Sequence, residues 1–85
     1  MRKLTQQDTD SIIGAEISGY RIIKARIKRG EFSDSDHYGI LFGRNKLRTH
    51  VTWQYHHDDG QPSVYWGHYM ESETAALRDF DERDA

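Results

Sequence analysis

A chain of 85 residues with a formal charge of −2 at neutral pH is enough for one small domain with a modest core. It contains no cysteine, which excludes disulfides and thiolate metal sites. No apolar run approaches the ~20 residues of a membrane helix, and the polar start does not resemble a signal peptide. We therefore expect a cytoplasmic domain, stabilised by large aromatic side chains, by self-association, or by both.

The charge is distributed unevenly along the chain. Residues 1–50 carry ten Lys and Arg against six Asp and Glu, whereas residues 51–85 carry two against eight. A basic half is compatible with a face that binds polyanions. Mutual neutralisation of the two halves across the fold is the more ordinary arrangement in a soluble domain. The sequence leaves both interpretations open.

The N-terminal segment predicts little regular structure. Residues 1–11 are polar and lack a clear period, so we expect them to fray. Thr9 or Asp10 would cap a short helical turn near Ile12, which Gly14 interrupts.

Two strands are predicted in the first half of the chain. Residues 20–27 alternate between apolar and polar side chains, and residues 38–43 alternate in the same way. The stretch between them, residues 29–36, has the composition of a loop.

The segment from His50 to Tyr69 is the most informative part of the sequence. It contains both tryptophans, three of the five tyrosines and four of the five histidines. Residues 49–56 and 64–70 alternate as strands around an Asp-Asp-Gly-Gln-Pro turn at 58–62. Residues 72–83 predict a helix, with Ser72 as its N-cap. These elements predict a single α+β domain over residues 1–85, in which a four-stranded antiparallel meander has one C-terminal helix packed on one face.

Alternation divides the predicted sheet into two faces. We expect the large apolar side chains to form the core beneath the helix: Ile23, Ala25, Ile27, Tyr38, Ile40, Phe42, Val51, Trp53, Val64 and Trp66. The opposite face is polar and aromatic and carries Gly39, Gly43 and Gly67. These glycines either mark bulges and twist or leave room for a close approach by a ligand.

The polar face supplies the predicted binding surface, whose members are Tyr20, Lys24, Arg26, His50, Gln54, His56, Tyr65 and Tyr69. Tyr and Arg dominate the energetics of protein interfaces, and a meander exposes two edge strands. We therefore expect a protein partner or a homodimer, bound through this face or through an edge strand. The alternative is single-stranded nucleic acid, with bases stacked on the tyrosines and phosphates held by lysine and arginine.

Patterns typical of catalysis and of metal binding are weak. The histidines lack the HExxH spacing of zinc enzymes, and Asp58 and Asp59 are typical turn residues. Residues 34–37 contain the side-chain types of a catalytic triad, but adjacency in sequence does not produce triad geometry. There is no nucleophile elbow and no Gly-rich phosphate loop. We expect a binding protein rather than an enzyme, with no cofactor, metal or small-molecule substrate.

Four short runs carry a resemblance to known sequences: GYRII at 19–23, VTWQ at 51–54, YWGHY at 65–69 and ALRDF at 76–80. With these runs the chain resembles a group of small uncharacterised bacterial proteins that are often carried on mobile or conjugative elements. The likeness covers residues 19–83, and the YWGHY run is its most distinctive part. It implies a bacterial cytoplasmic setting and assigns no functional residue.

Overall fold

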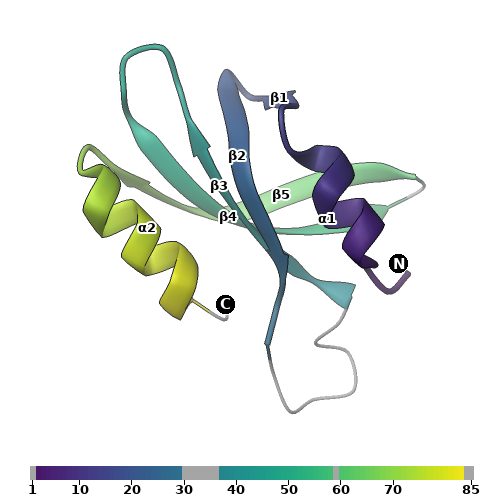
Figure 1. Cartoon of the computed structure of the whole chain (residues 1–85). Helices are drawn as coiled ribbons and strands as arrows, with labels where there is room; N and C mark the ends of the chain where they lie inside the picture. The colour runs from purple at the N-terminus through teal and green to yellow at the C-terminus, as the bar shows by residue number, and fades with distance from the viewer. Residues whose placement is uncertain (1, 30–36, 59, 84–85) are drawn as a thin grey trace.

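The structure, a computed structural model, describes residues 2–29, 37–58 and 60–83. Its elements in chain order are α1 (Gln6–Ile12), β1 (Glu16–Ile17), β2 (Tyr20–Ile27), β3 (Gly39–Arg44), β4 (His50–Asp58), β5 (Gln61–Met70) and α2 (Glu73–Glu82). The strands form one antiparallel sheet in the order β1-β2-β3-β4-β5, with the two helices on opposite sides of it (Figure 1). The α+β class with an antiparallel sheet is confirmed. The expected four strands and one helix are corrected to five strands and two helices within the described residues.

α1 begins earlier than expected because the sequence contains a capping box. The Thr5 hydroxyl accepts a hydrogen bond from the Asp8 N–H at 3.2 Å, and the Asp8 carboxylate accepts one from the Thr5 N–H at 2.8 Å. Arg2 binds the same carboxylate at 2.6 Å, and this hydrogen bond holds the pKa of Asp8 well below its usual range. The expectations that residues 1–11 fray and that Thr9 or Asp10 caps the helix are therefore wrong where the structure describes this segment.

β1 and β2 form a tight hairpin that the sequence analysis missed. Its two turn residues, Ser18 and Gly19, have φ angles of 51° and 84°. Positive φ at both central residues is the turn geometry that matches the twist of antiparallel strands. The turn brings Ile17 opposite Tyr20, so that a two-residue strand pairs with the start of β2.

The apolar core is divided between the two faces of the sheet. One buried cluster lies on the α1 side and consists of Leu4, Ile12, Ile22, Leu41, Val51, Trp53 and Tyr55. The second lies on the α2 side and consists of Ile40, Phe42, Ala76 and Phe80. The single apolar layer expected beneath the C-terminal helix is therefore wrong.

The physical reason is the register between β3 and β4. Leu41 pairs with Trp53, whereas Phe42 pairs with Thr52. Residues directly opposite each other on neighbouring strands point to the same face of the sheet. The side chains of β3 therefore point to the faces opposite to those expected, because a shift of one residue moves every side chain of a strand to the other face. Ile40 and Phe42 thus lie with the polar residues of β4, and Leu41 lies with Trp53.

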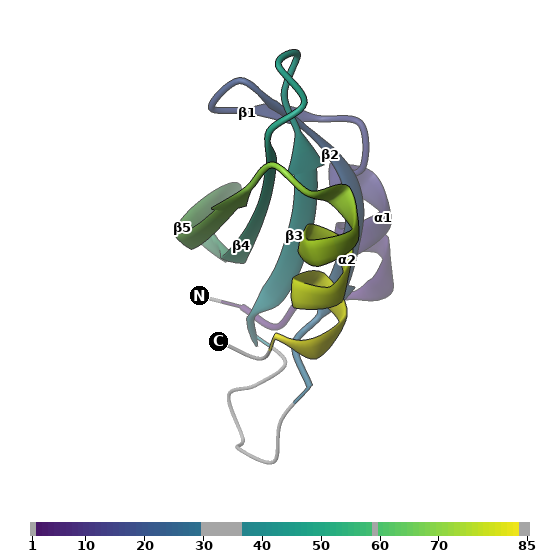
Figure 2. The ribbon, with the colours of Figure 1, turned by 90° about the vertical axis from the view of Figure 1, so that its left-hand side faces the viewer.

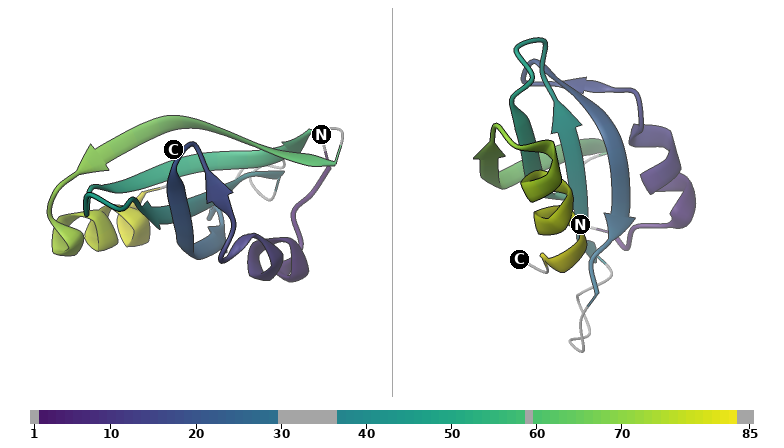
Figure 3. Two further views of the ribbon diagram at one scale, coloured as in Figure 1. Left: turned by 90° about the horizontal axis from the view of Figure 1, so that it is seen from above. Right: turned by 60° about the vertical axis from the view of Figure 1, so that its left-hand side comes forward.

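α2 packs on the face that carries Thr52 and His50, as Figure 2 shows from the α2 side. Ser72 caps it as expected, because its hydroxyl accepts the Ala75 N–H at 3.1 Å. Register shifts interrupt the pairing of β2 with β3 and of β4 with β5, and such bulges strengthen local twist. The sheet is accordingly strongly curved (Figure 3).

Residues 30–36 of the predicted loop lie outside the described residues. No helix within the described ranges is long and apolar enough to cross a membrane.

Candidate functional site

β5 combines length with exposure at one edge of the sheet. It spans ten residues, from Gln61 to Met70, none of which is Asp, Glu, Lys or Arg. Figure 2 shows it at the left-hand edge, where one side of its backbone has no neighbouring strand in the described sheet. Natural edge strands are usually short or carry charges that prevent pairing with other chains. Pro62 blunts only the first residues of β5, so most of this edge is open to strand addition.

A bulge near the middle of β5 places Trp66 in solvent. Thr52 pairs with His68 and Gln54 pairs with Tyr65, so Trp66 and Gly67 together oppose Trp53. Trp66 has a φ of 54°, a conformation that costs a bulky side chain about 1–3 kcal/mol. Its side chain is 64% exposed, so its predicted place in the core is wrong.

The C-terminal turn of α2 holds this bulge in place. The Arg83 guanidinium donates to the Thr52 carbonyl at 2.8 Å, to the Thr52 hydroxyl at 2.9 Å and to the Trp66 carbonyl. The Asp79 carboxylate accepts from the Thr52 hydroxyl and lies 2.9 Å from His68 Nδ1. One helix thereby binds both strands where their ladder is interrupted.

The charges in this network stabilise one another beneath the bulge. Burial lowers the pKa of Arg83, and the nearby carboxylate of Asp79 opposes that shift. Burial raises the pKa of Asp79, but the hydrogen bonds from Thr52 and His68 outweigh it, so this pKa lies below its usual value. Asp79 is therefore an anion at neutral pH and remains a strong acceptor for both strands.

Tyr69, three residues beyond Trp66, is the second exposed aromatic side chain of β5. It is 59% exposed, and its hydroxyl accepts a hydrogen bond from Trp53 Nε1 at 3.3 Å. Tyr20 packs edge-on against the Trp53 ring at 5.5 Å and lies 6.0 Å from the Tyr69 ring. These three rings lie on the α1 side of the sheet, where Trp53 joins the buried cluster.

The glycines of the sheet serve this internal packing. A Cβ added at Gly67 would lie 2.8 Å from Trp53 Nε1 and from the Tyr69 ring. A Cβ at Gly39 would overlap the Tyr55 ring. Both contacts are closer than real Cβ atoms allow, so these positions accommodate neighbouring rings of the chain itself.

Tyr65, Gln54 and His56 form a polar and aromatic group on the α2 side. Gln54 Nε2 donates to the Tyr65 hydroxyl at 2.9 Å, and the His56 ring lies edge-on to Tyr65 at 5.3 Å. Burial raises the pKa of Tyr65, while the hydrogen bond from Gln54 opposes that change. Gln54 is buried and the other two are partly buried, so this group presents little side-chain area to a partner.

The three remaining predicted residues attach α2 to the sheet. Arg26 donates to the Phe80 carbonyl at 2.8 Å and to the Arg83 carbonyl, which satisfies the C-terminal end of the helix. Lys24 Nζ lies 5.4 Å from the centre of the Phe80 ring. His50 is buried, with its ring stacked on Phe42 at 5.8 Å.

The predicted binding surface is therefore not a single surface. Tyr20 and Tyr69 lie on the α1 side, and the other six residues lie on the α2 side, where the helix covers or engages several of them. Trp66 was missed as a surface residue. The signal that could have found it is Gly67, because an isolated glycine inside a strand pattern often marks a bulge.

Within the described residues no group of three or more His, Asp or Glu side chains could hold a metal ion. Comparison of the chain with protein-family models, with curated proteins and with solved structures found no match. The proposal for its function therefore depends on the geometry of β5 alone.

Proposed function

We propose that this chain is a non-enzymatic protein-interaction module that binds through the β5 edge, with Trp66 and Tyr69 as its aromatic anchors. The observation that carries the proposal is a ten-residue edge strand without Asp, Glu, Lys or Arg that has a strained, exposed tryptophan at its bulge. Strand addition to such an edge supplies main-chain hydrogen bonds, and neighbouring side chains supply specificity. Trp and Tyr are among the residues that contribute most to binding energy at interfaces.

The strain at Trp66 supports a role in binding rather than in folding. A glycine would adopt the positive φ at this position without cost, yet the chain places tryptophan there and holds its carbonyl with Arg83. Strained residues persist where the surrounding structure imposes them, and they cluster at functional sites. The bulge turns the indole out of the core, where a partner can bury it.

A second copy of the chain is the partner that this edge fits best. Antiparallel pairing of β5 with itself would bring its own residues opposite one another in a symmetric interface. Like charges directly opposite each other destabilise such pairs, and β5 contains no Asp, Glu, Lys or Arg, while its His68 lies beside the Asp79 carboxylate. The small formal charge of −2 adds little repulsion between copies.

Sedimentation equilibrium over a wide concentration range tests this proposal. We expect the wild type to dimerise, and Trp66→Lys to weaken dimerisation by about 30-fold or more, as expected for the loss of an interface hot spot. Leu47→Lys is the matched control, because Leu47 is 87% exposed in the β3–β4 turn and lies outside β5. Amide hydrogen exchange along β5 should slow as the concentration rises, and exchange along β3 should not.

A chain that stays monomeric at every concentration would contradict self-association. Equal effects of Trp66→Lys and Leu47→Lys on dimerisation would show that it depends on the total exposed apolar surface rather than on Trp66. Binding of single-stranded oligonucleotides that weakens steeply with salt would favour the nucleic-acid alternative instead. That alternative remains a prediction, although the residues on which it relied lie on both sides of the sheet.

A further inference from the structure

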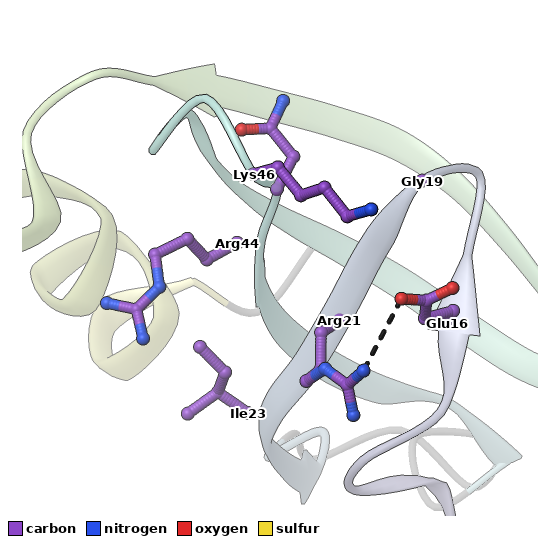
Figure 4. A pocket seen from close by; sticks show the side chains of 7 residues that line it. Glu16, Gly19, Arg21, Ile23, Arg44 and Lys46 are labelled. Atoms are coloured by element: carbon purple, nitrogen blue, oxygen red, sulfur yellow. Dashed lines mark hydrogen bonds and ion pairs between the residues drawn. The ribbon is translucent and has the colours of Figure 1, made fainter.

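A basic cleft lies where the β1–β2 turn approaches the β3–β4 turn, at the end of the sheet shown uppermost in Figure 1. Its volume is about 290 Å³, and it is lined by Glu16, Gly19, Arg21, Ile23, Arg44, Asn45 and Lys46. Figure 4 shows the three cationic side chains arranged around it. Three cations therefore face one carboxylate, and none of these residues belongs to β5.

The strand register creates a charge repulsion within this cleft. Arg21 and Arg44 are direct partners in the pairing of β2 with β3. Like charges directly opposite each other on antiparallel strands are destabilising. A negative charge between the two guanidinium groups would reduce this repulsion and stabilise the fold.

The carboxylates of the chain itself compensate this repulsion only weakly. Arg21 lies 3.4 Å from Glu16, and Arg44 lies 3.9 Å from Glu73, with all four side chains well exposed. Exposed pairs of this kind contribute about 0–1 kcal/mol and exchange readily for a better anion. Lys46 makes no ion pair with any residue that the structure describes.

The wall that carries Lys46 is formed before any ligand arrives. The Asn45 side-chain oxygen accepts the N–H groups of Leu47 at 3.0 Å and Thr49 at 2.8 Å. The backbone N–H of Asn45 also donates to the Thr49 carbonyl at 3.0 Å. A turn held in this way positions its charge without a large ordering cost on binding.

We propose that this cleft binds a phosphate group. Guanidinium forks match the geometry of phosphate oxygens, and lysine contributes a point charge. A dianionic phosphate would balance the excess of cations over the single carboxylate and would separate Arg21 from Arg44. The volume is at the lower limit of small-molecule sites, about 300–1,000 Å³, so the rest of the phosphate-bearing molecule would extend into solvent.

The phosphate would come from a soluble phosphomonoester or from a nucleic-acid backbone, and two probes distinguish these sources. Phenyl phosphate presents a dianionic monoester, whereas oligothymidylate presents monoanionic diesters. Saturable binding of either probe at the cleft supports the phosphate site, and the tighter one identifies the source. Because the cleft and β5 share no residue, this proposal and the proposed self-association fail independently.

The test is a titration with inorganic phosphate followed by amide NMR, with sodium chloride keeping the ionic strength constant. We expect saturable shifts at Arg21, Arg44 and Lys46 and no shifts along β5. Arg21→Gln should weaken phosphate binding about tenfold or more, because it removes charge-assisted hydrogen bonds. Arg48→Gln is the matched control, since it makes the same charge change in the β3–β4 turn, next to the cleft but not lining it.

A second readout separates binding from folding. In chloride alone, Arg21→Gln should melt at or above the wild-type temperature because it relieves the repulsion of Arg44, and phosphate should raise the melting temperature of the wild type and of Arg48→Gln by more than that of Arg21→Gln. Lys46→Gln, a change on an exposed turn, replaces Arg21→Gln if that variant does not fold. Shifts that never saturate, or equal responses of all the variants to phosphate, would overturn the proposal.

Discussion

The two tryptophans occupy opposing positions on the paired strands β4 and β5, at one bulge, and have contrasting environments. Trp53 is 3% exposed in the α1-side cluster, enclosed by the rings of Tyr20 and Tyr69. Trp66, on the neighbouring strand, is 64% exposed. Both are tryptophans on neighbouring strands, but Trp53 lies in the central strand β4 and Trp66 in the edge strand β5, where its positive φ breaks the alternation of side chains. Burial of the two indoles thus depends on strand position and on a local backbone conformation, neither of which the hydrophobic pattern encodes.

The largest expected effect comes from truncating the buried indole. Trp53→Ala should lower the free energy of unfolding by about 3–5 kcal/mol, because it opens a cavity among packed rings. Trp66→Ala should change it by only about 0.5 kcal/mol, as surface substitutions do, while weakening dimerisation. Urea unfolding measures the first quantity and sedimentation the second. The reverse ranking of the two variants in urea would refute the contrast between the tryptophans.

A smaller but still large effect is expected from the residue that fixes the bulge. Arg83→Gln should cost about 2–3 kcal/mol, since it removes charged hydrogen bonds from the carbonyls of Thr52 and Trp66. It should also alter the fluorescence of the exposed indole, because the carbonyl of Trp66 loses its anchor. Arg78→Gln, on the exposed side of the same helix, is the control and should stay within about 0.5 kcal/mol. Equal losses for both arginines would show that Arg83 does not hold the bulge.

The third prediction concerns Gly67, which follows Trp66 in the bulge and packs against the Trp53 ring. Gly67→Ala should destabilise the fold by about 1–3 kcal/mol, because its methyl group would overlap Trp53 Nε1 and the Tyr69 ring. NMR shifts should concentrate at Trp53 and Tyr69, whose mutual hydrogen bond must lengthen. A variant as stable as the wild type, with that bond intact, would mean that the crowding is relieved elsewhere.

Local features were predictable where short-range chemistry decides them. The strand at Tyr20–Ile27 and the cap at Ser72 agree with the structure, because alternation and hydroxyl capping operate within a few residues. The capping box of Thr5 and Asp8 and the Ser18-Gly19 turn were also readable and were missed. The relation between strands was not predictable in this way, since a one-residue change of register moved Leu41 and Phe42 to the opposite faces.

The candidate site was less predictable than the fold. Tyr69 was included in the predicted surface and is exposed, but Arg26 and His50 are used to attach α2, which no local pattern reveals. Trp66 could not be placed in solvent by alternation, which assigns every second residue of β5 to the core. The basic cleft likewise depends on residues from three strands and two turns, so its charges are brought together only by tertiary pairing.

The smallest expected effect is a dependence of stability on pH at the contact between α2 and the bulge. The pKa of Asp79 is lowered in the folded chain, so its anionic form contributes stability that is fully present above its ordinary value of 3.8. That contribution is lost as the pH falls through the lowered folded-state pKa, because protonation removes the acceptor for Thr52 and His68. Urea midpoints measured from about pH 6 down to about pH 3 should therefore fall less steeply for Asp79→Asn than for the wild type. The pKa of Asp8 is also lowered, but Asp8 remains in both proteins, so the difference between the curves isolates the α2 contact from the α1 cap.

Asp81→Asn, an exposed change on the same helix, is the control and should follow the wild-type curve. A curve that instead matches Asp79→Asn would assign the effect to helix charge rather than to the contact that holds Trp66 outside the core.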